Sequence, residues 1–153
     1  MIKKTLLMIM LCICLVLAGC TPSGETLTSK GIADKVQKAA DFAELTDVTV
    51  NYLEKYLMID AADLASWVMR RDATRATPEM ILVLEVKAEA DQAEIKQAVA
   101  DYNEEQLFQY RDYQPAQVFK LEDAKVMEQG AFIVLIVSPN AAKTNAALGS
   151  GWK

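Results

Sequence analysis

Two short runs of this sequence are apolar on both of their faces, and they constrain the fold more than any other feature. They are 80–87 (MILVLEVK) and 131–138 (AFIVLIVS). Such a run predicts a central strand, covered on both sides, rather than a strand with one face in water. A further extended run at 124–128 precedes the second, and Gly130 supplies the positive φ that a hairpin turn needs. The sequence therefore predicts three strands, two of them joined as a hairpin.

Five helices are predicted around these strands, and each begins at a residue that can accept backbone N–H bonds as a cap. The caps are Ser29, Asp47, Asp60, Asp91 and Ser138. The first helix extends to about residue 44. The third is expected to hold Leu64, Trp67 and Val68 at helical spacing. For the second helix, an extended segment at 48–50 remains an alternative.

The fourth helix has the clearest signals. Its start, DQAE at 91–94, is a capping box in which Glu94 occupies the third helical position. It is expected to extend to about residue 112, because Pro115 cannot continue a helix. Its apolar stripe consists of Ile95, Val99, Tyr102 and Tyr110.

The order of these elements predicts an α+β domain over 29–148. We expect a small, mainly antiparallel, three-stranded sheet packed with helices, with the N-terminal helices preceding the sheet. Residues 149–153 (GSGWK) are expected to form a flexible tail.

The first 19 residues have the layout of a secretory signal peptide. Two lysines precede an apolar run at 6–18 that is too short to span ~30 Å of hydrocarbon comfortably. The ending LAGC at 17–20 resembles the lipobox of bacterial lipoproteins, which implies cleavage before Cys20 and a lipid on its sulfur. An ordinary signal peptide, or an uncleaved anchor with an incidental cysteine, is the alternative. Residues 20–28 would then form a lipidated, flexible tether, and the chain would lie on the extracytoplasmic face of the cell membrane.

Charge and residue types exclude several functions. Without the leader the chain carries 14 Lys and Arg against 21 Asp and Glu, because Lys3 and Lys4 leave with it. An excess of seven negative charges makes nucleic acid an unsuitable partner and argues against flat adsorption on anionic lipid. The sequence has no histidine, and Cys20 would be the one mature cysteine, so Ser-His and Cys-His nucleophiles are excluded. No cofactor and no metal site is expected.

Three blocks between residues 57 and 148 resemble a family of lipoproteins from Gram-positive bacteria that carries the domain of unknown function 4358. The first block is a short helix, a Thr-Pro break and the apolar strand at 80–87. The second is a long charged helix that closes on Tyr113-Gln114-Pro115 and then Gln117. The third is GAFIVLIVSPNA at 130–141. The resemblance implies location and architecture, and it implies no activity or site residue.

One concentrated basic patch is a candidate anion-binding site, and it consists of Arg70, Arg71 and Arg75. One interpretation places these residues at the C-terminus of the third helix, where cations are favourable by ~0.3–1 kcal/mol each. The other is a clamp for a phosphate or carboxylate, on a lipid headgroup or a wall polymer.

A second candidate surface consists of aromatic residues that alternate with charged ones on and after the long helix. They are Tyr102, Phe108, Tyr110 and Tyr113. They are either part of the core or the lining of a groove for a partner or a sugar. The stripe is imperfect, because Gln106 stands where helical spacing requires an apolar residue.

No catalytic set is predicted. Glu104 and Glu105 are adjacent on a helix and point about 100° apart, which is typical of a solvated face. We therefore expect a membrane-anchored binding or interaction module without catalysis, with an envelope protein or polymer as partner. The alternatives are a cell-envelope enzyme, or enzyme accessory, that uses carboxylates, and a structural protein that self-associates through its sheet edge.

Overall fold

The computed structural model describes residues 27–153. The predicted signal peptide, Cys20 and most of the tether lie outside the described residues. A five-stranded antiparallel sheet with the order β1-β2-β3-β5-β4 forms the centre of the molecule. Its strands are β1 Leu45–Asp47, β2 Leu64–Asp72, β3 Met80–Val86, β4 Val126–Gln129 and β5 Phe132–Val137.

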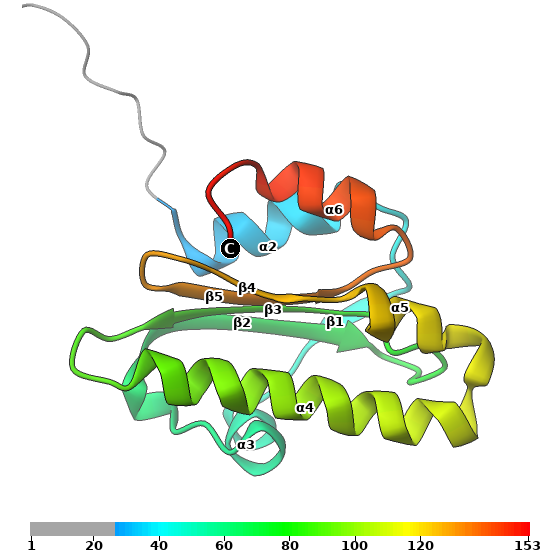
Figure 1. Ribbon diagram of the computed structural model, residues 1–153, viewed down its shortest axis with the longest axis horizontal. Helices are drawn as coiled ribbons and strands as arrows, with labels where there is room; N and C mark the ends of the chain where they lie inside the picture. The colour runs from blue at the N-terminus through cyan, green and yellow to red at the C-terminus, as the bar shows by residue number, and fades with distance from the viewer. Residues whose placement is uncertain (1–26) are drawn as a thin grey trace, which may run out of the picture.

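Helices cover both faces of this sheet (Figure 1). On one face lie α2 (Ser29–Gln37) and α6 (Ala141–Leu148), which contact each other. On the other face lie the long α4 and several short elements. These elements are α3 Val50–Tyr52, the π-helical turn η1 Leu53–Leu57, the 3₁₀ turn η2 Ala61–Asp63, α4 Gln92–Tyr113, the 3₁₀ turn η3 Pro115–Gln117 and α5 Val118–Asp123. None of the helices in residues 27–153 is long and apolar enough to cross a bilayer.

The α+β class is confirmed, but the prediction of a three-stranded sheet preceded by helices is wrong. The sheet has five strands, and helices lie both before and after it in the chain. The two missed strands are β1, which has three residues, and β2, which has nine. The segment 64–72 was expected to be helical and is instead a strand beside β3.

An irregularity in the pairing of β2 with β3 explains the helix-like spacing of Leu64 and Trp67. The register with β3 shifts between Leu64 and Ser66, so the alternation of side chains is interrupted there. Leu64 and Trp67 consequently face the same side despite their spacing of three, and both belong to the core beneath α4. That spacing is also the spacing of one helical turn.

The two central strands, β3 and β5, are buried on both faces, as their apolar sequences predicted. In β3, Leu82 and Leu84 face the α4 side, and Ile81 and Val83 face the α2 side. All four are completely buried, and their neighbours in β5 are at most 4% exposed. Each face of the sheet therefore has its own apolar core.

The boundaries of the helices differ from expectation mainly in α2 and α6, the two helices on one face of the sheet. The first helix ends at Gln37 rather than near residue 44, because the chain then leaves the helix to reach β1. The last helix is capped by the Asn140 side chain, which accepts from Lys143 N, and not by Ser138. The second helix forms at 50–57 with Thr49 as its N-terminal flanking residue. The start of α4 is confirmed, since Asp91 Oδ1 accepts from Glu94 N at 3.1 Å.

The C-terminal residues 149–153 pack on the domain. Lys153 and Glu128 of β4 exchange two backbone hydrogen bonds, and Trp152 packs against the core of the α2 side. Gly149, with φ of 87°, ends α6 as expected.

Candidate functional site

The three candidate arginines do not form one patch. Arg70 and Arg71 lie on β2, where successive side chains point to opposite faces of the sheet. Arg70 faces α2, and Arg71 faces α3. Arg75 lies in the turn between β2 and β3. The interpretation that placed these residues at a helix C-terminus is therefore wrong.

Arg70 is paired with acidic and amide side chains within the domain. Its Nη1 donates to Asp34 Oδ1 at 2.7 Å and to Gln37 Oε1 at 2.8 Å, and its Nε donates to Asp47 Oδ1 at 3.0 Å. Burial opposes the charged form of Arg70, but these carboxylates outweigh it and raise its pKa. Arg70 thus joins α2 to the sheet, and two carboxylates already neutralise its charge.

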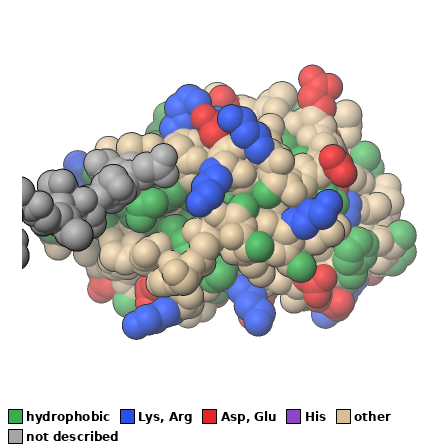
Figure 2. All heavy atoms as spheres, turned by 90° about the horizontal axis from the view of Figure 1, so that it is seen from above, with side chains coloured by type: hydrophobic (Ala, Val, Ile, Leu, Met, Phe, Trp, Pro, Cys, Tyr) green, Lys and Arg blue, Asp and Glu red, His purple; other side chains and the backbone are tan. Residues whose placement is uncertain are grey.

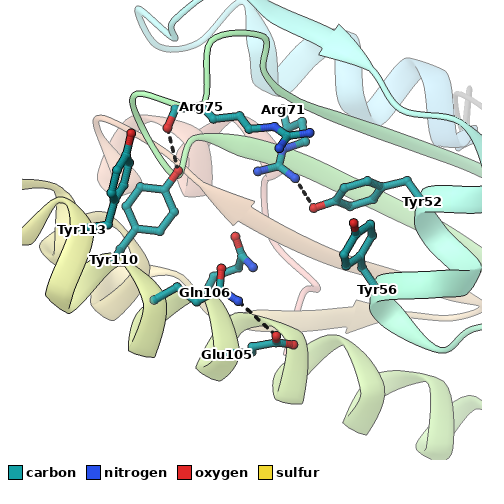
Figure 3. Close-up of a pocket in the computed structure, with 9 residues that line it drawn as sticks. Tyr52, Tyr56, Arg71, Arg75, Glu105, Gln106, Tyr110 and Tyr113 are labelled. Carbon is teal, nitrogen blue, oxygen red and sulfur yellow. Dashed lines mark hydrogen bonds between the residues drawn. The ribbon is translucent and has the colours of Figure 1, made fainter.

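Arg71 and Arg75 instead line a pocket of about 300 Å³ between the α3–η1 segment, the β2–β3 turn and α4. Figure 3 shows the Arg75 side chain extending towards Arg71, with four tyrosines around the two guanidinium groups. The lining residues are Tyr52, Tyr56, Arg71, Arg75, Glu105, Gln106, Gln109, Tyr110 and Tyr113.

The Arg71 guanidinium lies over the Tyr52 ring, 4.9 Å from the centroid, and its Nη1 donates to the Tyr52 hydroxyl. That hydroxyl also bonds to the Tyr102 hydroxyl at 2.9 Å, which anchors Tyr52 to α4. The Tyr56 ring packs on Tyr52 with centroids 4.5 Å apart. A guanidinium has five N–H donors, and the described residues form no ion pair with Arg71. Donors of Arg71 therefore remain for a ligand.

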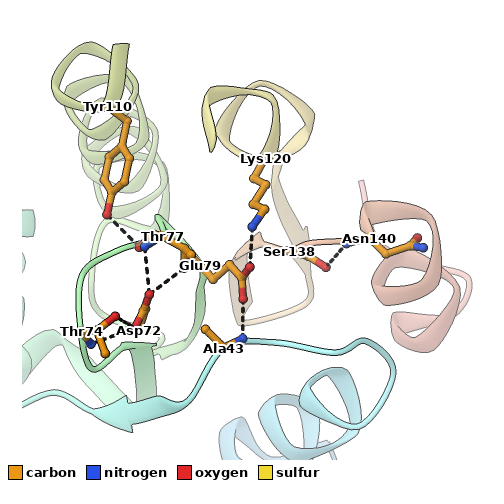
Figure 4. Close-up of polar contacts among 9 residues, drawn as sticks. All are labelled: Ala43, Asp72, Thr74, Thr77, Glu79, Tyr110, Lys120, Ser138 and Asn140. Atoms are coloured by element: carbon orange, nitrogen blue, oxygen red, sulfur yellow. Dashed lines mark hydrogen bonds and ion pairs between the residues drawn. The ribbon is translucent and has the colours of Figure 1, made fainter. Parts of the chain in front are cut away.

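The turn that carries Arg75 is built around the buried carboxylate of Asp72 (Figure 4). Asp72 accepts from the backbone N–H and the hydroxyl of both Thr74 and Thr77, at 2.7–2.9 Å. Burial alone would raise the pKa of Asp72, but these four hydrogen bonds outweigh burial and lower it. Arg75 sits in this turn with a φ of 60°, which the Asp72 network holds in place.

Tyr110 fixes the same turn from α4. Its hydroxyl donates to Thr77 O at 2.7 Å and is 3.3 Å from Arg75 O. Burial raises the pKa of Tyr110, so its hydroxyl stays protonated as the donor. The Tyr113 ring meets Tyr110 edge to face, with centroids 6.4 Å apart, and is itself largely exposed.

A buried ion pair holds the chain where the β2–β3 turn enters β3. Lys120 Nζ of α5 donates to Glu79 Oε1 at 2.5 Å, and Ala43 N donates to Glu79 Oε2 at 2.6 Å (Figure 4). Glu79 is 4% exposed and directly precedes β3. The pair therefore ties three segments of the chain together at the end of the sheet that carries the pocket.

The aromatic candidates divide between core and pocket. Tyr102 and Tyr110 are buried, as the core interpretation predicted, but Tyr110 also lines the pocket. Tyr113 lines it from the end of α4, and Phe108 is exposed outside it. Gln106, which interrupts the apolar stripe, faces the pocket, so the irregularity of the stripe was a usable signal for the site.

Acidic residues play different parts in the domain. Glu104 and Glu105 are both exposed, and Glu105 is the acidic residue that lines the pocket. Asp60 and Asp91 cap η2 and α4 through backbone N–H groups. Within residues 27–153 no group of three acidic or cysteine side chains could hold a metal ion.

Sequence reasoning missed Tyr52 and Tyr56. They belong to a short helix far from α4 in sequence, and the pocket forms because that helix packs beneath the sheet beside α4. Their spacing of four residues puts both on one helical face, which is the one signal that the sequence offered.

Residues 38–138 match the family described as "Domain of unknown function (DUF4358)". The matched region contains the whole sheet and every residue that lines the pocket, and it leaves out α2 and α6. No curated protein and no solved structure matches the chain. The resemblance noted in the sequence is therefore confirmed for this domain.

Proposed function

The chain belongs to the DUF4358 family, whose name assigns no activity, and we propose from the structure that it is a binding module whose ligand occupies the Arg71–Arg75 pocket. We further propose that it acts as a lipoprotein, anchored through Cys20 on the extracytoplasmic face of the cell membrane. The lipobox-like ending at 17–20 supports the anchor.

The observation that carries the binding proposal is the convergence of two arginines in a pocket that holds one carboxylate. Arg70, the neighbour of Arg71, shows how this fold satisfies a structural arginine, because it meets two carboxylates and an amide. Arg71 meets a tyrosine hydroxyl instead. A cation left without an anionic partner beside a preformed pocket favours an external anion.

The remaining lining defines the class of ligand. Tyrosine rings offer flat apolar faces, and their hydroxyls and the amides of Gln106 and Gln109 offer hydrogen bonds. A pocket of about 300 Å³ is at the small end of ligand sites. We propose that it binds a compact carboxylated or phosphorylated ligand with a hydroxyl-bearing ring, such as an acidic saccharide unit.

Calorimetric titration of the chain with glucuronate and glucose 6-phosphate tests this proposal, with glucose as the neutral probe. We expect the acidic probes to bind and glucose to bind far more weakly. Arg71→Gln removes a charged hydrogen bond, so its affinity should fall about 10- to 100-fold. Arg111→Gln is the matched control, because Arg111 is exposed on α4 outside the pocket. Equal affinities for charged and neutral probes, or an unchanged affinity in Arg71→Gln, would contradict the proposal.

A cell-envelope enzyme that uses carboxylates is the second candidate. That function needs two carboxyl groups that face each other across a cleft, whereas Glu105 is the acidic residue that lines the tyrosine-rich pocket. The balance of two arginines against one carboxylate is the observation that favours binding over this alternative.

A further inference from the structure

The two helical layers of the domain carry opposite charge. In the α2–α6 layer, at 27–44 and 138–153, five lysines stand against three acidic residues. In the layer on the other side of the sheet, at 48–63 and 87–125, twelve acidic residues stand against six basic ones. The net acidity, which for the chain as a whole argues against flat adsorption on anionic lipid, is therefore concentrated on the α4 side.

The basic side chains of the α2–α6 layer are accessible. Figure 2 looks onto this layer and shows Lys and Arg side chains spread across it. Its lysines are Lys30, Lys35, Lys38, Lys143 and Lys153, and all five are exposed. Of the three acidic residues, Asp34 is already engaged by Lys30 and Arg70.

A groove with an apolar floor lies in the same layer. It has a volume of about 630 Å³, and Ile32, Leu148 and Trp152 contribute its apolar lining, with Lys35 and Lys38 beside them. Leu27, which is 43% exposed, lies at the groove as well. Trp152 and Leu148 are half-buried and Leu27 is exposed, and tryptophan beside lysine at such a surface suits the interfacial region of a bilayer.

The described part of the chain begins at this layer. Leu27 lies two residues before the start of α2 and seven positions after Cys20 in sequence. Seven residues span at most about 25 Å when fully extended. An anchor at Cys20 therefore holds the α2–α6 layer within a short distance of the lipid headgroups.

We propose that the α2–α6 face docks on the anionic surface of the membrane, with its lysines among the headgroups and Trp152 at the interface. This inference rests on the proposed anchor at Cys20. The acidic α4 side is repelled by the same surface, so the two layers together select one orientation. The anchor supplies the attachment, and the lysines set which face of the domain meets the lipid.

This orientation has a consequence for the Arg71–Arg75 pocket. Residues of α3 and α4 line the pocket, and these helices lie on the opposite side of the sheet from α2 and α6 (Figure 1). A docked domain holds its pocket away from the lipid, where a soluble or wall-borne ligand can enter. The ligand of the pocket is then not a headgroup of the bilayer that carries the protein.

The test uses the chain from Cys20 to Lys153, coupled through its single thiol to a maleimide phospholipid in vesicles. This coupling tests the face whether or not Cys20 is acylated in the cell, so failure of the anchor and failure of the docking are distinguishable. The readout is quenching of tryptophan emission by brominated lipid. The contribution of Trp152 is the part that Trp152→Phe removes.

We expect quenching in vesicles that contain phosphatidylglycerol, and its loss in phosphatidylcholine alone or in 0.5 M salt. Each lysine shifts the ratio of docked to undocked domain about fivefold, so the triple change Lys35→Gln, Lys38→Gln, Lys143→Gln should lower it about 100-fold. The matched control removes three exposed charges outside this layer, with Lys55→Gln, Arg111→Gln and Lys125→Gln. It should keep the quenching. Three results would overturn the proposal. They are equal quenching with phosphatidylglycerol and with phosphatidylcholine alone, unchanged quenching after the triple lysine change, and no quenching in the unaltered chain.

Discussion

The buried pair between Lys120 and Glu79 gives a sharp test of how the end of the sheet is held. We consider Lys120→Met, which keeps most of the aliphatic stem and removes the ammonium group. The change leaves the Glu79 carboxylate 4% exposed, with the Ala43 N–H as its remaining partner. The perturbation thus isolates the electrostatic part of the contact from its packing.

The burial of both partners sets the expected size of the effect. The Lys120 side chain is 9% exposed, and the two charged atoms are 2.5 Å apart. Removing one partner of a buried pair costs about 3–5 kcal/mol, because the other charge stays buried without compensation. Natural domains of this kind have about 5–15 kcal/mol of stability in total. Lys120→Met should therefore lower the melting temperature by roughly 12–20 °C.

A double-mutant cycle separates the pair from its surroundings. Glu79→Gln in the Lys120→Met background keeps an acceptor for Ala43 N and removes the stranded charge. We expect the double variant to recover at least half of the lost free energy of unfolding. Urea unfolding followed by circular dichroism measures each variant, and an unchanged slope with denaturant concentration shows that the compared states are the same.

The control is the exposed pair between Lys96 and Glu128, whose side chains are each 36% exposed. Lys96→Met should cost at most about 1 kcal/mol, because water screens such pairs. If Lys120→Met costs no more than Lys96→Met, or if the double variant is less stable than Lys120→Met, the reasoning from burial is refuted.

Three further changes have defined outcomes. Tyr110→Phe removes the bond to Thr77 O and should cost about 1 kcal/mol, or roughly 4 °C in melting temperature, while a cost near zero would contradict that bond. The lowered pKa of Asp72 means that its contribution to stability is present above about pH 4 and is lost as pH falls through the folded value; Asp72→Asn should flatten that part of the stability–pH curve, and an unaltered curve would show that Asp72 does not titrate there. Cys20→Ser should abolish metabolic labelling with fatty acid, and continued labelling would exclude lipidation at that residue.

The strongest periodic signals in the sequence identified the elements that are buried on both sides or amphipathic over many turns. The β3 strand was found because both of its faces are apolar, and the 22-residue helix α4 was found because its capping box is followed by apolar residues at helical spacing. The pattern that identifies such an element lies entirely within its own residues, so the sequence alone predicts it.

The edge strand β1 was missed for a physical reason. The three residues of β1 carry no apolar alternation, and their burial pattern runs from half-buried to exposed. A short edge strand is defined by its partner, and β1 exists because Arg70, Arg71 and Asp72 of β2 pair with it. No property of 45–47 alone specifies that pairing.

The candidate site shows how a single error in secondary structure redirects a functional prediction. On a helix, Arg70 and Arg71 would lie about 100° apart and could share one anion. On a strand they point to opposite faces, so one arginine fastens α2 while the other reaches the pocket. Arg71 and Arg75 line one pocket, but Arg70 was grouped with them because the three arginines are close in sequence, and the irregular register at Leu64–Ser66 hid the strand that separates them. Strand alternation, and not the concentration of charge along the sequence, decides which arginine is free to bind.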